Sequence, residues 1–247
     1  MESWFPALKE VKAGDEPCVI CIYHAGGNGN VFYRFMHISE KILVAPVELP
    51  GHGRRAKEPC GESFVKMAKS IAKEVSQRFS NRKLYIYGHS LGTILAYEVC
   101  KCLEKSYDIF PKLLIVSGRN APFDSDLSTF KTSMGEQMLI EEMRRYKFMP
   151  ETLLENKGFM DYFLPITMND YKMGEDYLYD DSEKILTPIF LNYGDCDIEI
   201  VPERLDLWKD VTKGSFHKKV YSGGHFFMFD KESTYFEDLV KTVIQSA

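Results

Sequence analysis

The sequence predicts an α/β fold in which a mostly parallel, doubly wound sheet carries one helical insertion. Three observations lead to this fold class: short apolar runs alternate with amphipathic stretches, several runs are apolar at every position, and one long segment contains helical patterns only. A run that is apolar throughout is typical of a parallel strand whose sheet is covered by helices on both faces. With 247 residues and 45% hydrophobic side chains, we expect a single domain over residues 1–247.

Six apolar runs are predicted to be the strands of this sheet. They are CVICIY (18–23), ILVAPVEL (42–49), KLYIYG (83–88), KLLIVSG (112–118), TPIFLNYG (187–194) and HKKVYSG (217–223). Two helices are predicted from apolar side chains that recur every three or four residues. Their apolar faces consist of Phe64, Met67, Ala68, Ile71, Ala72 and Val75, and of Phe236, Leu239, Val240, Val243 and Ile244. Strands that alternate with helices in this way indicate a doubly wound sheet.

Residues 123–182 interrupt the alternation and are predicted to form a helical lid. This segment contains no convincing strand pattern, and it holds seven of the eleven methionines. They are Met134, Met138, Met143, Met149, Met160, Met168 and Met173. Because methionine side chains repack around ligands of different shape, the segment suits the cover of an acyl pocket. The alternative is that the methionines fill the core of the insertion itself.

Charge and hydropathy exclude several classes of partner. The net charge is −5 and no basic stripe is present, which argues against nucleic acid. The N-terminal stretch lacks a basic segment followed by an apolar one, so we expect no signal peptide. No apolar run approaches the roughly 20 residues that a membrane-spanning helix needs. We therefore expect a cytoplasmic protein that binds neither nucleic acid nor membrane. We also expect a monomer.

The six cysteines do not indicate a metal site or a disulfide framework. Cys18 and Cys21 form a C-x-x-C pair, but they lie within a predicted strand, where side chains three residues apart point to opposite faces. No second pair has zinc-ribbon spacing. Because free cysteine is often buried, we expect buried thiols, no metal and no other cofactor.

The pentapeptide Gly-His-Ser-Leu-Gly (88–92) is a candidate nucleophile elbow around Ser90. A predicted strand precedes it and a helical pattern follows, which is the context that such an elbow requires. Gly88 and Gly92 leave room for the tight turn because larger side chains would meet the neighbouring strand and helix. The turn lifts the serine hydroxyl above the sheet, next to a helix N-terminus.

A serine nucleophile needs a base, and the base needs an acid that orients it. In folds with this elbow, the acid and the histidine follow the serine in the chain, each after a strand. Only His217 and His225 lie downstream of Ser90, and of these His225 follows a predicted strand. The strand that ends at residue 194 is followed by two candidate acids, of which the spacing favours Asp197 over Asp195.

Two backbone N–H groups are expected to bind the oxyanion of the tetrahedral intermediate. One belongs to Leu91, directly after the nucleophile. The other is expected in the glycine-rich stretch IYHAGGNGN (22–30) after the first strand, where Ala25 is favoured and Gly26 is the alternate. An ordinary glycine turn is the competing interpretation of this stretch.

Taken together, five motifs resemble those of the type II thioesterases, a group of α/β-hydrolases. The motifs are YHAGGNGNVFYRF, VAPVELPGHGRR, YGHSLGT, YGDCD and GGHFF, and the similarity runs from about residue 17 to the C-terminus. The oxyanion loop lacks the proline that family members usually have there. The resemblance implies an α/β-hydrolase fold with a helical lid. It also implies a triad of Ser90, Asp197 and His225, with Ala25 and Leu91 as oxyanion donors.

The resemblance also implies a substrate and a partner. Type II thioesterases act beside nonribosomal peptide and polyketide synthases, and the family includes the medium-chain acyl-carrier-protein thioesterase of mammals. They hydrolyse acyl or aminoacyl thioesters on the phosphopantetheine arm of carrier proteins, and so clear misprimed or stalled groups. Arg54, Arg55 and Lys57 follow a predicted strand and are candidates for docking the acidic carrier protein or the phosphate of its arm. A cluster that is merely solvated is the alternative.

Proteins with other functions can contain the same catalytic residues and fold. A generic carboxylester hydrolase or lipase would have the same triad, because acyl transfer from oxygen or sulfur needs the same groups. A medium-chain fatty acyl thioesterase is a further alternative within the family. A binding protein on a hydrolase scaffold is disfavoured by the complete set of motifs. The AGG and LPGHGRR segments favour a thioesterase.

Overall fold

The computed structural model describes residues 3–8, 14–124, 130–147 and 149–246. In this part of the chain, six strands form one sheet in the order β2-β1-β3-β4-β5-β6, and every neighbouring pair is parallel. The strands are β1 (Cys18–Ile22), β2 (Leu43–Pro46), β3 (Leu84–His89), β4 (Leu113–Ser117), β5 (Ile189–Gly194) and β6 (Phe216–Tyr221). Each predicted run contains most of one strand, so the strand predictions are confirmed.

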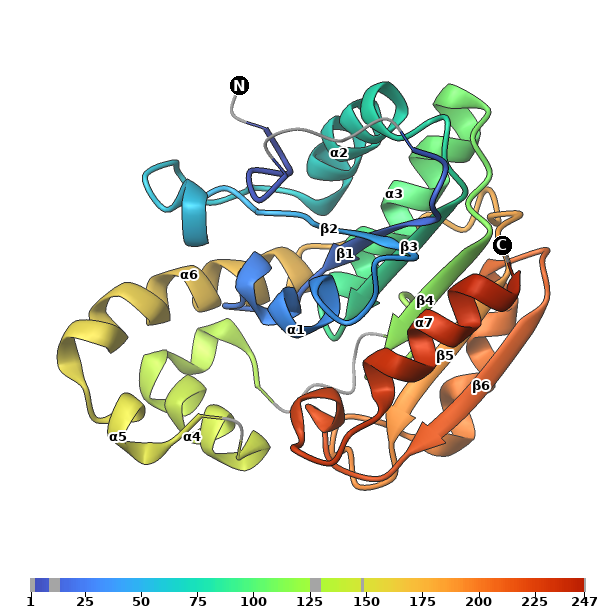
Figure 1. Cartoon of the computed structure of the whole chain (residues 1–247). Helices are drawn as coiled ribbons and strands as arrows, with labels where there is room; N and C mark the ends of the chain where they lie inside the picture. Colours follow the sequence, from blue (N-terminus) through green and yellow to red (C-terminus); the bar gives the residue numbers. More distant parts are fainter. Residues whose placement is uncertain (1–2, 9–13, 125–129, 148, 247) are drawn as a thin grey trace.

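Helices cover both faces of the sheet (Figure 1). Helices α2 (Phe64–Arg78) and α3 (Gly92–Tyr107) pack against each other on one face, and α1 (Tyr33–Met36) and α7 (Tyr235–Ser246) lie on the other. The two sides of β3 show this division: the Tyr85 hydroxyl donates to the carbonyl of Val243 in α7, whereas Gly88 lies against Ala96 of α3.

The predicted helix faces agree with the observed burial. All six apolar positions predicted for α2 are buried. The two cysteines of the C-x-x-C pair in β1, Cys18 and Cys21, are buried free thiols. In α7, Phe236, Leu239 and Val243 are buried as predicted. Val240 is half-buried against the core, and Ile244, in the last turn of that helix, is 41% exposed, so the margin of the predicted face is not buried.

The insertion between β4 and β5 is helical. Its helices are α4 (Glu136–Tyr146), α5 (Glu151–Leu154) and α6 (Lys157–Glu175), and residues 125–129 and 148 of the predicted 123–182 segment lie outside the described residues. The three helices form a separate layer at one end of the sheet (Figure 1). They share an apolar cluster of their own, which consists of Phe130, Leu139, Leu154, Met160 and Leu164. The insertion therefore has a second core in addition to that of the sheet.

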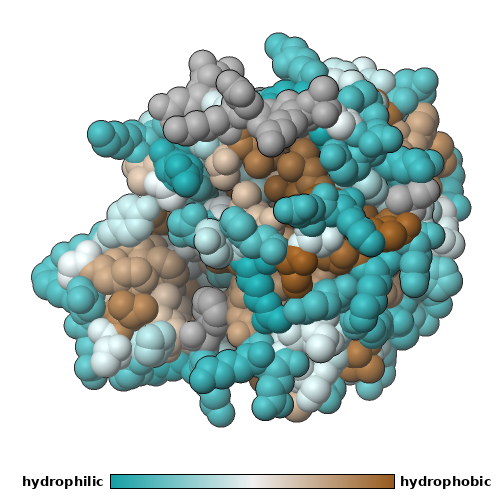
Figure 2. Space-filling view, in the orientation of Figure 1, coloured by the Kyte–Doolittle hydropathy of each residue, from teal (hydrophilic) through white to brown (hydrophobic). Residues whose placement is uncertain are grey.

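All strands are parallel, so their carboxyl ends meet at one edge, and this edge faces the insertion. The loops after β1, β3, β4, β5 and β6 contain residues 23–28, 90–91, 118–120, 195–201 and 222–226. Figure 2 shows a mostly hydrophilic face on which hydrophobic residues gather over the helical layer and in the centre. No helix in the described ranges combines the length and the apolar character that crossing a membrane requires.

Candidate active site

Ser90 occupies a strained turn between β3 and α3. Its φ angle is +52°, in the left-handed region that residues other than glycine rarely adopt. The Ser90 N–H donates to the carbonyl of Ser117 in β4 at 2.8 Å. The Ser90 carbonyl accepts the N–H of Thr93 at 3.0 Å and the Thr93 hydroxyl at 2.8 Å. These bonds hold the turn so that the serine side chain projects from the carboxyl edge of the sheet.

The two glycines of the motif make this turn possible. A Cβ atom at Gly88 would lie 2.6 Å from the carbonyl oxygen of Gly92 and 2.8 Å from the Cβ of Ala96. A Cβ atom at Gly92 would lie 2.3 Å from the carbonyl oxygen of Tyr23. All three distances are too short for non-bonded atoms, so the packing of α3 against β1 and β3 requires glycine at both positions.

His225, after β6, is held by Asp197, after β5. The His225 Nδ1 lies 3.0 Å from each carboxylate oxygen of Asp197, and both side chains are almost completely buried. Asp197 Oδ1 also accepts the N–H of Glu199 at 3.0 Å, which fixes the carboxylate. A carboxylate only accepts hydrogen bonds, so Nδ1 carries a proton. When the imidazole is neutral, its Nε2 therefore has a free lone pair.

The competing candidates for acid and base lie elsewhere. Asp195 is exposed, and its Oδ1 accepts the N–H of Gly223 at 2.9 Å, which ties together the loops after β5 and β6. His217 is exposed on the edge strand β6. Of the two candidate acids, Asp197 is the one that contacts His225.

Ala25 and Leu91 lie beside Ser90, and their N–H groups have no hydrogen-bond partner within the described residues. The N–H of Gly26 differs, because it donates to the Asp170 carboxylate of α6 at 2.7 Å. Gly26, the alternate oxyanion donor, is thus already engaged in this structure.

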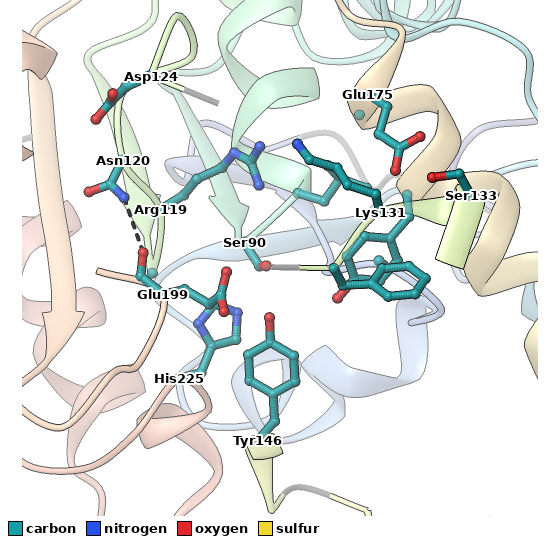
Figure 3. A pocket seen from close by; sticks show the side chains of 16 residues that line it. Ser90, Arg119, Asn120, Asp124, Lys131, Ser133, Tyr146, Glu175, Glu199 and His225 are labelled. Carbon is teal, nitrogen blue, oxygen red and sulfur yellow. Dashed lines mark hydrogen bonds between the residues drawn. The ribbon is translucent and has the colours of Figure 1, made fainter. Parts of the chain in front are cut away.

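Two cavities meet at Ser90. One has a volume of about 330 Å³, the other about 250 Å³, and both are lined by Ala25, Ser90, Tyr146, Tyr171 and His225. The larger cavity has a mixed lining that is the more polar of the two, and it is called the polar cavity here; its further lining includes Arg119, Asn120, Lys131, Glu175 and Glu199. The smaller cavity is mainly apolar, and its further lining includes Met143, Met149, Phe159, Phe163 and Ile166. In Figure 3 the Ser90 hydroxyl points into the polar cavity, with His225 and Tyr146 beside it.

Three histidine rings lie close together behind the serine. The ring centres of His89 and His225 are 5.0 Å apart, and those of His24 and His89 are 5.9 Å apart. Burial, and secondly the neighbouring His225, lowers the pKa of His89 well below its usual range and that of His24 to about 3. His24 and His89 are therefore neutral at neutral pH. His225 is the one that has a carboxylate partner on Nδ1.

The arrangement suits acyl transfer, and comparison with known proteins identifies the class. A family model for the thioesterase domain matches residues 17–246. This chain belongs to the thioesterase family. It is 32% identical to the thioesterase PikA5 of Streptomyces venezuelae over 86% of this chain and 76% of PikA5. It is 28% identical to the gramicidin S biosynthesis protein GrsT of Aneurinibacillus migulanus over 98% of this chain and 94% of GrsT.

Solved structures agree with this assignment. The thioesterase superposes on the type II thioesterase BorB from the borrelidin biosynthetic cluster with a TM-score of 0.80 and 26% identity, over 92% of this chain and 93% of BorB. The predicted α/β-hydrolase fold and the resemblance to type II thioesterases are therefore confirmed. Among the described residues, no group of three or more His, Cys, Asp and Glu side chains is arranged to hold a metal ion.

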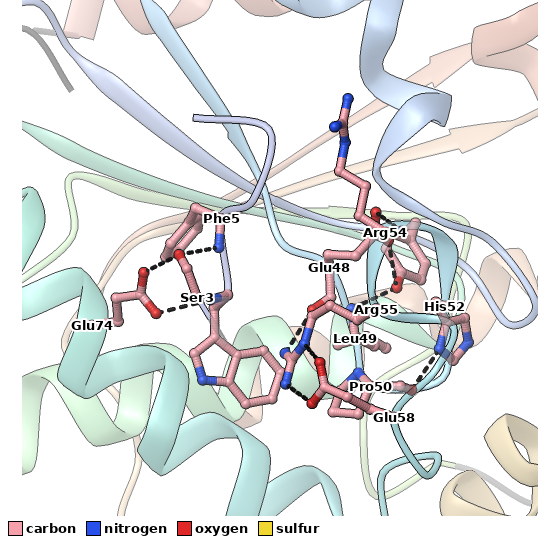
Figure 4. Close-up of polar contacts among 12 residues, drawn as sticks. Ser3, Phe5, Glu48, Leu49, Pro50, His52, Arg54, Arg55, Glu58 and Glu74 are labelled. Carbon is pink, nitrogen blue, oxygen red and sulfur yellow. Dashed lines mark hydrogen bonds and ion pairs between the residues drawn. The ribbon is translucent and has the colours of Figure 1, made fainter. Parts of the chain in front are cut away.

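The structure corrects one predicted site of the thioesterase. Arg55 was expected to be available to a partner, but it is only 2% exposed. Its guanidinium pairs with Glu58 at 2.6 Å, donates to the carbonyl of Glu48 and stacks on the ring of Trp4 (Figure 4). The side chain is thus a structural part of the loop after β2. Arg54 points away from this cluster in Figure 4 and is exposed, as is Lys57.

The methionines of the insertion serve both roles considered for them. Met143 and Met149 line the apolar cavity and also pack against the cluster of the insertion. Met160 is buried in that cluster and Met168 packs against it. Met173 belongs to the main core, and the remaining two are exposed. Both interpretations of the methionines therefore hold in part.

The sequence pattern missed several residues of the thioesterase site. Arg119 follows the carboxyl end of β4 and lines the polar cavity, so the rule that found His225 could have found it as well. Burial lowers the pKa of Arg119 and raises that of Glu199 on the opposite loop. Tyr146 and Tyr171 come from α4 and α6, and a single sequence gives no signal that these helices fold over the serine.

Proposed function

We propose that this thioesterase hydrolyses acyl or aminoacyl thioesters from the phosphopantetheine arm of carrier proteins and so edits a nonribosomal peptide or polyketide synthase. The observation that carries the proposal is the meeting of Ser90, the His225–Asp197 pair and two cavities of different polarity at one point. The names of GrsT and BorB, which refer to the biosynthesis of gramicidin S and borrelidin, support this choice of pathway class.

In the first half of the reaction, the Ser90 oxygen attacks the thioester carbonyl while His225 Nε2 takes the hydroxyl proton. Asp197 holds the imidazole in the required tautomer and stabilises the imidazolium that forms. The oxyanion accepts the N–H groups of Ala25 and Leu91. Collapse of the intermediate breaks the carbon–sulfur bond, and the imidazolium protonates the leaving thiolate to the free thiol. The acyl group then remains on Ser90.

In the second half, a water molecule replaces the thiol. His225 Nε2 takes a proton from this water as it attacks the acyl ester, and the same two N–H groups bind the second oxyanion. The ester bond to Ser90 breaks, and the imidazolium returns the proton to the serine oxygen. The products are a free acid and a carrier protein with a free thiol, which can be loaded again.

The two cavities suit the two parts of the substrate. The apolar cavity, with Met143, Met149 and Phe163, suits an acyl chain. The polar cavity, with Arg119 and Asn120, suits the amide-containing arm, whose carbonyl groups accept hydrogen bonds. In this proposal, residues 123–182 form a lid over the site within a single domain of residues 1–247. Arg54 and Lys57 remain as candidate contacts for the carrier protein.

The test compares one acyl group on two thiols. Wild-type enzyme is assayed with the group on a holo carrier protein and on a short free thioester, over a series of salt concentrations. We expect a larger kcat/KM for the carrier protein and a decrease of this value with salt, because exposed charges are screened within about 10 Å at 0.1 M. Equal, salt-independent values for the two substrates would leave a generic acyl hydrolase and overturn the proposal.

A serine-reactive probe separates an enzyme from a binding protein on the same fold. A fluorophosphonate should label the wild type and leave the Ser90→Ala variant unlabelled. Hydrolysis of both thioesters should disappear in that variant. Labelling or turnover that persists in Ser90→Ala would exclude Ser90 as the nucleophile.

A further inference from the structure

Three segments that are far apart in the sequence meet at Asp170, on helix α6 of the insertion. Asp170 Oδ2 accepts the N–H of Gly26, in the loop after β1, at 2.7 Å. The same oxygen lies 3.0 Å from Nε2 of His52, in the loop after β2. The side chains of Asp170 and His52 are 3% and 1% exposed. A buried carboxylate on the insertion therefore connects the two loops that flank the edge of the sheet.

The contacts of His52 define its protonation state. Its Nδ1 lies 2.9 Å from the carbonyl oxygen of Pro50, and its Nε2 faces the Asp170 carboxylate. Both neighbours only accept hydrogen bonds, so both ring nitrogens donate and the ring is an imidazolium. Burial opposes this charge, but the Asp170 carboxylate more than offsets the effect and raises the pKa of His52. His52 and Asp170 are thus a buried, neutral ion pair.

Helix α6 also packs directly on the loop that contains Ala25. Gly26 has a φ angle of +71°, and a Cβ atom there would lie 2.4 Å from the Thr167 hydroxyl and 2.8 Å from the Phe163 ring, both on α6. The other end of the loop is fixed by Glu48, which accepts the N–H of Gly29 at 3.0 Å. Ala25 directly precedes the anchored Gly26 in this loop, and it shares a cavity of about 10 Å³ with Asp170 and Leu91.

We propose that Asp170 is a positioning residue for the oxyanion hole: by binding the N–H of Gly26, it leaves the preceding N–H of Ala25 directed at Ser90. This inference rests on the proposed function, in which Ala25 and Leu91 bind the oxyanion. In this arrangement helix α6 contributes to catalysis and does not only cover the site. Loss of the Gly26 contact would free the loop, and the second oxyanion donor would lose its orientation.

His52 has a separate electrostatic role in this arrangement. The carboxylate of Asp170, beside the oxyanion hole, repels the negative charge that develops on the oxyanion. The positive charge of the His52 imidazolium offsets the charge of this carboxylate. As pH rises through the raised pKa of His52, the imidazolium is lost and the Asp170 charge becomes uncompensated. The other titratable groups that face the pair are Tyr23 after β1, Glu48 after β2 and Cys60 before α2. We therefore expect kcat to fall on the alkaline side.

The experiment removes the carboxylate in two ways and uses the short free thioester. Asp170→Ala should lower kcat by about tenfold to a hundredfold, with KM changed by less than about threefold, because an oxyanion contact acts in the transition state. Asp170→Asn keeps an oxygen for the N–H of Gly26 without the charge. It should retain kcat within about fivefold of wild type and lose the alkaline decrease. Asp161→Ala removes an exposed carboxylate from the same helix and is the matched control.

A second measurement isolates the oxyanion hole. A trifluoromethyl ketone analogue of the substrate forms a tetrahedral adduct with the serine. Its affinity should fall about tenfold or more in Asp170→Ala and stay unchanged in Asp161→Ala. The inference is overturned if folded Asp170→Ala keeps the wild-type kcat, if Asp170→Asn is as impaired as Asp170→Ala, or if the alkaline decrease persists in Asp170→Asn. Failure of the proposed function is distinct, because it would appear in the wild type itself, as equal, salt-independent kcat/KM values for the carrier-bound and the free thioester or as no hydrolysis of either.

Discussion

Replacement of Asp197 by asparagine should abolish most of the activity, whereas the same change at Asp195 should not. Asp197 faces His225 Nδ1 with both oxygens at 3.0 Å in a buried setting, and Asp195 is exposed and bonded to the N–H of Gly223. The two residues are two positions apart and undergo the same chemical change. Each variant therefore serves as the control of the other.

The expected magnitude follows from the geometry of the pair. An asparagine cannot stabilise the imidazolium by charge, and two unit charges about 4 Å apart interact by about 4 kcal/mol at an effective dielectric constant of about 20. Because about 1.4 kcal/mol changes a rate tenfold, Asp197→Asn should lower kcat/KM by about a thousandfold. Asp195→Asn should change it by less than about twofold, as is usual for a surface substitution.

The assay follows release of the thiol from a short free thioester, so that carrier binding does not enter. Thermal unfolding of both variants shows whether each is folded, since Asp197 also accepts the N–H of Glu199. A loss at Asp195→Asn together with near wild-type activity at Asp197→Asn would refute the assignment of the acid. Equal small losses of kcat/KM at both positions would refute the thousandfold decrease derived from the charge of Asp197.

Two further predictions concern the surface and the stability. Charge reversal by Arg54→Glu together with Lys57→Glu should lower kcat/KM on the loaded carrier protein by about tenfold at low salt and leave kcat/KM on the short thioester unchanged. Lys241→Glu on α7 is the control. An equal loss on both substrates would contradict a docking role. The unfolding free energy should fall below about pH 6.5 by about 1.4 kcal/mol per pH unit for His89. The folded state keeps this imidazole neutral because its pKa is well below the usual range, whereas the unfolded chain takes up a proton. Urea unfolding over a pH series should give a shallower slope for His89→Gln, and parallel curves would contradict this account.

The sheet could be predicted from the sequence because its signals are local. A parallel strand covered on both faces is apolar along its length, as in CVICIY, and the strand can be recognised without its neighbours. The face of α2 follows from a period of 3.6 residues in the same way. Ile244 is exposed because it lies at the margin of the apolar face of α7, four residues after the half-buried Val240, whereas Val243 in the same turn is fully buried.

The residues predicted for the site all lie in strand-end loops, where topology determines position. Ser90, Asp197 and His225 follow β3, β5 and β6, and parallel strands bring these ends to one edge. Asp170 and His52 could not be found in this way, because their contact depends on how the insertion folds over the sheet. The sequence also could not predict that Arg54 is exposed while Arg55 is buried, because adjacent residues on a 3-10 turn point in different directions.

If Asp170 positions the oxyanion hole as proposed, the insertion links the choice of substrate to the rate of reaction. Tyr146 of α4 and Tyr171 of α6 line both cavities, while Asp170 on the same α6 holds the loop beside the serine. A substitution that shifts α6 to admit a longer acyl chain therefore also displaces the Asp170 carboxylate from Gly26. Such a variant should gain binding of the new substrate and lose kcat on every substrate. Met143 and Met149 also line the apolar cavity but do not belong to α6, so substitutions there that conserve side-chain volume should change acyl preference with a smaller loss of kcat.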